Sequence, residues 1–470
     1  MKKNLITFTI LIFIWPSYLL GLEEECPSLI FPYEIEEVVN LDDICFLYIT
    51  VSRRSSDGID NFEKYIDTLK YFKNIKKLSI TVVSPNDKDS TYYTRIFEKL
   101  PKLENIEEIS ISYSGPLPEE LPNFSSVEKL TLWNYYEWVR YRPFEEPDEF
   151  FYPGQDKEDS IAITEFAKSF SPPPFPDQLF NNIENVKYVN MRLSKTDTLL
   201  PDNLFQYTPD IQSIIIEENG LKQLPSSIGK LNKLNLLSIH DCFLEPDFME
   251  KWTSYSDSLR HLLLGRINHF RTIFVEREEK KIYSQPCANF KEFEVDVTNM
   301  SNLESFAMSL PNVKNLDNTL KKFPPNIKGL NFQNMKSLKS IGENFCRRKS
   351  HNSLSLTFLG ANSLEEIRSL KNCQLEYLSL QSFKSQLIWN QLPKIINEAN
   401  LKTLVMDYKS IKSVQPERFK PFKELEELLI SRSSSIGTDK YTHRFRDDEF
   451  DKKWLEEIRE VLPDTEVEIQ

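Results

Sequence analysis

The chain has 470 residues, of which 40% are hydrophobic and 27% charged, and its formal net charge is −13 at pH 7. This length exceeds what one ordinary compact core holds, so we expect two or three domains or one elongated repeat structure. Only 11 residues are glycine, which argues against an enzyme built on glycine-rich dinucleotide or phosphate loops. The acidity would repel nucleic-acid phosphates, so we expect no nucleic-acid partner.

The chain begins with a segment typical of export signals. Two lysines precede an almost unbroken apolar run from Leu5 to Leu20, which Pro16 interrupts. The run is short for a transmembrane helix, so we predict that residues 1–21 form a signal peptide and that the protein is secreted or exported, to the extracellular space, the cell surface or the periplasm. A retained anchor helix is the alternative. No later segment is apolar enough to span a bilayer, so we expect no membrane span after signal removal.

From about residue 44 the chain repeats one unit, in which the first, fourth and sixth positions are apolar. Self-similarity at intervals of 21 to 26 residues predicts a solenoid. The register is open in two places: His351 fits as the start of a weak unit, and either Phe290 or Leu303 can start a unit between Gly265 and Ile327. The other units start at Ile44, Ile75, Ile106, Val127, Val186, Ile211, Leu234, Leu259, Ile327, Leu375, Leu401 and Leu425.

Within each unit the fourth and sixth positions share one face of a strand, because side chains alternate along a strand. One turn cannot bury that face alone, whereas stacked turns bury it together beneath a parallel sheet. We expect thirteen or so strands, which would extend on the order of 60 Å at the usual strand spacing.

The most regular unit is similar to a known family. Ile211, Ile214, Ile216, Asn219 and Leu221 follow the pattern of the leucine-rich repeat. This resemblance implies an α/β solenoid, a horseshoe with a parallel sheet on its concave face and an irregular or short-helical convex side. It also implies that the asparagine amide satisfies backbone groups inside the turn. The next unit has Cys242 at that position, which the family accepts, and most other units depart from the pattern there.

Both ends of the repeat array are predicted to be capped, as an open solenoid requires. Phe450, Trp454, Ile458 and Val461 follow helical spacing, and Pro463 would end that helix before a short strand at residues 465–469. The predicted organisation is therefore a signal peptide (1–21), an N-terminal cap with the first repeat (22–74), a solenoid (75–438) with an insertion (133–175), and a C-terminal capping helix and strand (439–470).

The third, fifth and seventh positions of each unit should point out of the concave face. Exposed aromatic, arginine and apolar side chains gathered there are typical of a protein-binding surface. The alternative is that these residues merely tolerate exposure or are covered by the insertion. Farther along the chain we expect a more polar surface that includes an acidic strand with Glu292, Glu294 and Asp296. The predicted partner-binding residues are Trp133, Tyr188, Arg192, Ile215, Glu217, His240 and His261.

The insertion is a second candidate for binding. Nine aromatic residues between Trp133 and Tyr152 alternate with acidic residues, and several prolines disfavour regular structure. Loops that leave a rigid scaffold commonly carry recognition. The alternative is a surface loop that packs its own aromatic side chains against the solenoid.

The cysteines and histidines suggest disulfides more readily than metal or catalysis. In an exported chain, Cys26 could pair with Cys45 and Cys346 with Cys373, although all six cysteines could instead be buried thiols. No spacing fits a zinc site, and no common catalytic motif is present. We therefore expect no metal, no cofactor and no enzymatic activity.

These observations predict a non-catalytic, exported, monomeric protein that binds a protein or another extracellular macromolecule. Binding would use the concave face, the aromatic-acidic insertion, or both. The alternative prediction is a structural envelope or surface protein that acts by self-assembly.

Overall fold

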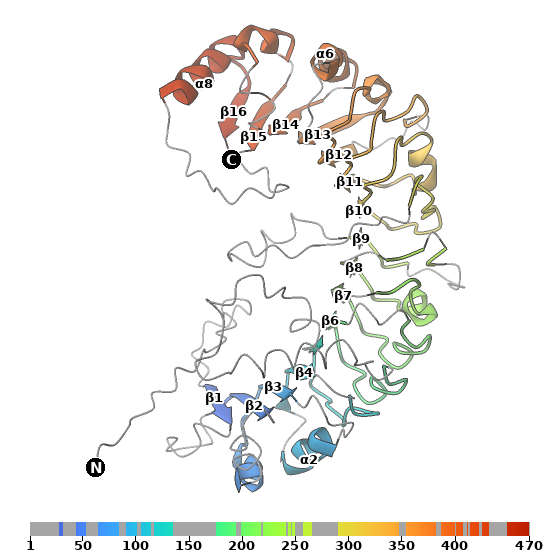
Figure 1. Cartoon of the computed structure of the whole chain (residues 1–470), viewed down its shortest axis with the longest axis vertical. Coiled ribbons are helices and arrows are strands. Elements are labelled where there is room, and N and C mark those ends of the chain that lie inside the picture. The colour runs from blue at the N-terminus through green and yellow to red at the C-terminus, as the bar shows by residue number, and fades with distance from the viewer. Residues whose placement is uncertain are drawn as a thin grey trace, which may run out of the picture.

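The chain forms an open horseshoe with a single parallel sheet along its inner side, as the computed structural model in Figure 1 shows. Among the described residues the sheet has 16 strands, and each strand pairs with the strands before and after it in the sequence. The predicted leucine-rich-repeat horseshoe is thereby confirmed. The structure describes residues 28–31, 44–52, 64–83, 91–100, 105–113, 117–134, 175–193, 199–217, 220–240, 243–245, 247–249, 257–265, 290–346, 354–381, 387–399, 401–407, 411, 414–422, 425–431 and 449–469.

Each strand is short, and its parallel partner comes from the next turn of the solenoid. The strands are β1 (Ser28–Phe31), β2 (Phe46–Ser52), β3 (Lys77–Val83), β4 (Glu108–Tyr113), β5 (Lys129–Asn134), β6 (Tyr188–Arg192), β7 (Ser213–Glu217), β8 (Leu236–Ile239), β9 (His261–Leu264), β10 (Ser305–Ser309), β11 (Gly329–Gln333), β12 (Leu354–Leu359), β13 (Leu375–Gln381), β14 (Thr403–Asp407), β15 (Glu427–Ser431) and β16 (Glu466–Ile469).

The convex side carries helices and irregular turns, also as the resemblance implied (Figure 1). Helices longer than one or two turns occur near the two ends, whereas the middle turns use single 3-10 helices. The α-helices are α2 (Thr91–Lys99), α6 (Leu387–Ala399) and α8 (Glu449–Val461), and the 3-10 helices are η4 (Ile66–Tyr71), η6 (Ser226–Lys230), η8 (Thr319–Lys322), η9 (Arg368–Asn372) and η10 (Pro416–Phe422).

The core is one continuous cluster between the sheet and the convex turns. Successive strands place aliphatic side chains in register, as with Ile214, Leu237 and Leu262, all of which are fully buried. Phenylalanines from the convex turns pack behind them, for example Phe180 against Phe205 with ring centroids 5.5 Å apart. This stacking explains why no single turn is stable by itself, since each turn buries its apolar face only against its neighbours.

The structure decides both open points of the repeat register. Leu303 precedes β10, so it starts the unit between Gly265 and Ile327, and no strand forms at Phe290. The predicted acidic strand is wrong, because residues 292–296 alternate between exposed and buried but pair with no strand. The unit predicted to start at His351 is also wrong by two residues: Leu356 and Phe358 pair with the core positions of β11.

The first and last strands of the described sheet are β1 and β16. A strand that the sequence did not suggest, β1, lies within the predicted N-terminal cap and pairs with β2. At the other end α8 and β16 form where the sequence predicted a helix and a strand. Trp454 fastens α8 by donating its indole N–H to the carbonyl of Val414 at 3.0 Å. None of the described helices is both long and apolar enough to cross a bilayer.

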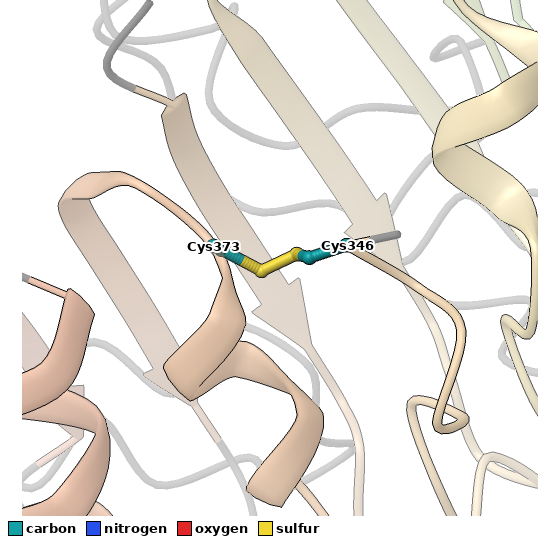
Figure 2. The surroundings of a disulfide bond; sticks show 2 residues. All are labelled: Cys346 and Cys373. Atoms are coloured by element: carbon teal, nitrogen blue, oxygen red, sulfur yellow. A yellow bond between two sulfur atoms is a disulfide. The ribbon is translucent and has the colours of Figure 1, made fainter. Parts of the chain in front are cut away.

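Behind β11–β13 the convex turns are joined by a disulfide between Cys346 and Cys373, whose Cα atoms are 5.2 Å apart (Figure 2). Cys373 directly follows η9, and Cys346 ends the preceding turn, so the bond links two neighbouring repeats. Cys45 is also disulfide-bonded; its predicted partner, Cys26, lies outside the described residues. No free cysteine occurs among the residues that the structure describes.

Two polar contacts reinforce the same turns. The carboxylate of Asp317 accepts hydrogen bonds from the backbone and side-chain N–H groups of Asn344 at 2.7 and 3.2 Å, and the backbone bond holds the pKa of this carboxyl below its usual value. The side-chain amide of Gln391 accepts a hydrogen bond from the N–H of Ile367 at 2.8 Å and donates one to the carbonyl of Glu365 at 2.7 Å. Asn219 and Cys242, to which the repeat pattern assigned the role of satisfying backbone groups inside the turn, lie outside the described residues.

Candidate binding surface

The parallel register arranges the outward residues of the sheet in three rows. We call them the entry, middle and exit rows, and they contain the third, fifth and seventh residues of each unit. On β6 these are Tyr188, Asn190 and Arg192. Because neighbouring strands lie about 4.8 Å apart, side chains of one row contact each other from strand to strand. The seven predicted partner-binding residues all fall on these rows, on β5–β9 or directly after β8.

The exit row places two charged groups side by side between two aromatic rings. The guanidinium carbon of Arg192 lies 4.7 Å from the ring centroid of Trp133, a cation–π distance. On the next two repeats, Nδ1 of His240 lies 3.4 Å from Oε1 of Glu217, an ion pair when the imidazole is protonated. All four side chains keep part of their surface in contact with solvent. The row is therefore ordered before any partner arrives, which lowers the entropy cost of binding.

Apolar side chains follow on the other two rows. Tyr188 is 43% exposed on the entry row, and Ile215 is partly exposed at the centre of the middle row. Leu263 and Ala307 pack with Leu236 in a small cluster that is separate from the main core. Leu263 and Ala307 are only 4% and 3% exposed, so Leu236 is the member of this cluster that keeps part of its surface in contact with solvent.

One asparagine on the middle row has unused hydrogen-bonding capacity. Oδ1 of Asn190 is buried and makes no hydrogen bond within the described part of the chain. A buried acceptor without a partner costs free energy, so a ligand that donates to it gains more than from an exposed group.

His261 marks the far edge of this surface. Its Nδ1 lies 2.8 Å from Oγ of Ser305 on β10. Partial burial lowers the pKa of His261, nearby Glu304 opposes this effect and Arg260 adds to it. The imidazole is therefore neutral at pH 7, and it acts as a polar ring rather than as a cation.

We define the patch as the seven predicted residues together with Leu236 and Leu263. The two leucines were not predicted as partner-binding residues, although their positions in the unit pointed outward. A single leucine at an outward position is common, and only the contact across strands shows that they form a cluster.

The strands before the patch carry a different pattern. Lys77, Glu108 and Lys129 form a ladder across β3, β4 and β5, with Nζ–carboxylate distances of 3.4 and 2.6 Å. Opposite charges in register stabilise neighbouring strands, so this ladder has a sufficient structural explanation. The ladder also marks the boundary of the patch toward the N-terminal strands.

Most of the predicted insertion lies outside the described residues. Residues 133 and 134 belong to β5 rather than to the insertion, and residues 135–174 lie outside the described residues. Within the described part of the chain no group of three or more His, Cys, Asp or Glu residues could hold a metal ion. Whether the insertion binds a partner, and whether the protein lacks catalytic activity, stay predictions.

Similarity of this chain to known proteins is limited to solved structures. No protein-family model matches the chain, and no curated protein matches it in sequence. Among solved structures, the chain is similar to the leucine-rich repeat domain of the type III effector XopL, with 17% identity over 58% of this chain and 88% of that domain, and a TM-score of 0.32. It is also similar to chains of the Drosophila Toll–Spatzle complex (13% identity, 83% of this chain, 46% of that chain, TM-score 0.34) and of the mouse RP105/MD-1 complex (13%, 80%, 58%, 0.30).

All three TM-scores are below 0.5, so the class of this protein stands on its own sheet. One short parallel strand per turn, a continuous core behind it and a mostly irregular convex side define a leucine-rich-repeat solenoid. The concave face of such a scaffold is broad, and its specificity depends on scattered outward side chains rather than on a sequence motif.

Proposed function

We propose that this chain is an exported, non-catalytic protein that binds a protein, or another extracellular macromolecule, through the patch on β5–β9. The observation that supports the proposal is the exit row, where Trp133, Arg192, Glu217 and His240 stand ordered beside an apolar cluster. Tryptophan, tyrosine and arginine contribute most of the binding energy in protein interfaces. Export is proposed from residues 1–21 alone.

Substitutions that place an acidic residue within the patch test this proposal. The full chain, secreted from its own signal, serves as bait, and a captured partner is then purified and its affinity measured. Arg192→Glu and Ile215→Asp should each weaken binding at least about tenfold, because they place an acid where the patch offers a cation–π pair and an apolar centre. Lys230→Glu is the matched control, since it makes the same charge change on an exposed lysine of η6, on the convex side.

Two outcomes would contradict the proposal. Equal affinity of wild type, Arg192→Glu and Ile215→Asp would show that the partner binds elsewhere. Loss of binding on deletion of residues 136–174, with full binding by both patch variants, would assign recognition to the insertion.

Self-assembly is the second candidate function. It is suggested by β16, which pairs only with β15 among the described strands, because the terminal strand of an open sheet can pair with another chain. Light scattering separates the two candidates: a monodisperse monomer at high concentration argues against assembly, whereas a concentration-dependent rise in mass argues for it.

A further inference from the structure

A second region of the concave face has a different character from the patch. The three rows of β10–β13, all of which are described, hold no charged side chain. Apart from Leu359 and Tyr377 their residues are small or neutral polar, and most of the middle and exit rows is buried. Charged side chains border this region: Glu376 precedes Tyr377 on β13 and is exposed, and Lys328 pairs with Glu304 at 3.1 Å. A surface without charge in so acidic a chain selects a neutral ligand.

The entry row of this region is lined by small residues between two rings, and we call this row the trough. Ser305, Gly329 and Ser355 lie side by side on β10, β11 and β12, and all three are partly exposed. The row continues to a ring at each end, His261 on β9 and Tyr377 on β13. The two rings stand four strand spacings apart, or about 19 Å. The side chains between the two rings are short, since they belong to two serines and a glycine. We call these three residues the floor of the trough.

Polar groups line the floor. The hydroxyl group of Ser355 can donate and accept hydrogen bonds, and that of Ser305, which already bonds to Nδ1 of His261, can make one more. Beside Gly329, on the middle row, Oδ1 of Asn331 is buried and has no hydrogen-bond partner among the described residues. Burial raises the pKa of the Tyr377 phenol, so this ring remains neutral.

We propose that this trough binds a neutral oligosaccharide, laid across the strands with about one sugar unit on each. Sugar hydroxyl groups match the serine and asparagine groups of the floor, and the flat apolar faces of pyranose rings stack on aromatic rings such as Tyr377. The advance per unit of a β-1,4-linked pyranose chain is close to the strand spacing, and successive rings face opposite ways, so equivalent groups recur at every second strand. An extended peptide advances about 3.4 Å per residue and would lose this register.

Gly329 provides a clean structural test. A Cβ added there would meet its nearest neighbour, Cβ of Ser305, at 3.7 Å, an ordinary contact. Gly329→Ala should therefore leave the fold and the trough intact, whereas Gly329→Phe places a ring on the floor of the trough. Tyr377→Phe keeps the stacking ring, and Tyr377→Ala removes it.

The measurement is calorimetric titration of the full chain with β-1,4-linked glucose, N-acetylglucosamine and mannose oligosaccharides of two to six units. We expect at least one series to bind, with an affinity that rises to about four units and then levels off. The tetramer of β-1,4-linked mannuronate, a charged counterpart of the mannose tetramer, should not bind. Gly329→Phe and Tyr377→Ala should each weaken binding at least about tenfold, while Gly329→Ala and Tyr377→Phe stay within about threefold.

Several results would overturn the proposal: no neutral series binds, the mannuronate tetramer binds as tightly as the neutral sugars, or Gly329→Phe binds like wild type. The outcome is separate from that of the protein-binding proposal. Arg192→Glu should retain full saccharide binding, because Arg192 lies three strands away from β9, at the other end of the patch.

Discussion

The patch on β5–β9 and the trough on β9–β13 belong to the same sheet, yet they differ in their outward side chains and in the contacts between the convex turns behind them. The patch presents Trp133, Arg192 and Glu217 over turns that are joined by hydrogen bonds of backbone and hydroxyl groups, such as that from the N–H of Phe205 to Oγ of Ser227. The trough presents small neutral residues over turns that a disulfide and two amide networks join. A surface of small side chains depends on backbone position for its shape, which explains why stiff turns support it.

This comparison predicts that variants behind the trough loosen β11–β13 and leave β6–β8 unchanged. Hydrogen exchange reports the free energy of local opening for each set of strands, and a solenoid opens locally because its contacts are between neighbours. The strands β6–β8 serve as the internal control in each experiment below.

The largest effect is expected from the disulfide. It closes a segment with a sequence separation of 27 residues, and loop-closure entropy for this length contributes up to about 3.5 kcal/mol. The double variant Cys346→Ser, Cys373→Ser should lower the opening free energy of β11–β13 by an amount approaching this value. Unchanged exchange in β11–β13 would show that the disulfide does not stiffen the trough.

The next effect concerns Gly342, in the turn that Asp317 and Asn344 fasten. Its φ is +89°, a region that favours glycine, and an added Cβ would lie 2.7 Å from Cα of Asp317. Gly342→Ala should therefore destabilise the trough turns by about 2–3 kcal/mol. Gly329→Ala is the control, with an expected change below about 1 kcal/mol. Similar exchange in the two variants would contradict this account of the turn.

Gln391 is expected to have a somewhat smaller effect. Gln391→Ala leaves the buried N–H of Ile367 without its acceptor, which costs about 1–3 kcal/mol. Asn390→Ala, at the neighbouring exposed position of α6, should change the opening free energy by less than about 0.5 kcal/mol. If the two substitutions have equal effects, the amide bridge does not support the turn.

The smallest effect is a pH dependence at His261, where patch and trough meet. Burial holds the pKa of His261 below its ordinary value, so the unfolded chain binds this proton more readily than the folded chain. The stability contributed by neutral His261 is present above about pH 6.5 and is lost as the pH falls through this value toward the folded-state pKa. His261→Gln should reduce the loss of stability between pH 8 and pH 5 in urea unfolding; an identical pH profile would contradict the expected role of burial.

Much of the fold could be predicted from the sequence because core positions are dictated by alternation. Ile214 and Ile216 show this directly, since a parallel sheet buries every second residue of its strands on one face. The repeat unit that contains β12 was predicted to start at His351, two residues too early, because Leu354 and Leu356 offer the same alternation as Leu356 and Phe358. The helix α6 was missed since Pro393 lies inside it, and proline normally argues against a helix interior.

The candidate sites were only partly predictable. Trp133 and Arg192 could be assigned to one surface from the period of the repeat, but their stacking required the register between β5 and β6. The trough escaped prediction because serine and glycine carry no distinctive signal. It becomes visible only when Ser305, Gly329 and Ser355 are seen to lie side by side.

The most direct test of the account is hydroxyl-radical footprinting of the chain with and without its captured partner. The account predicts that oxidation of Trp133, Tyr188 and His240 falls in the complex, because these side chains are partly exposed on the proposed contact surface. Tyr71 and Tyr207, which are 51% and 49% exposed outside the concave strands, should be oxidised equally in both states. Protection of Tyr71 or Tyr207 with unchanged oxidation of Trp133, Tyr188 and His240 would contradict it.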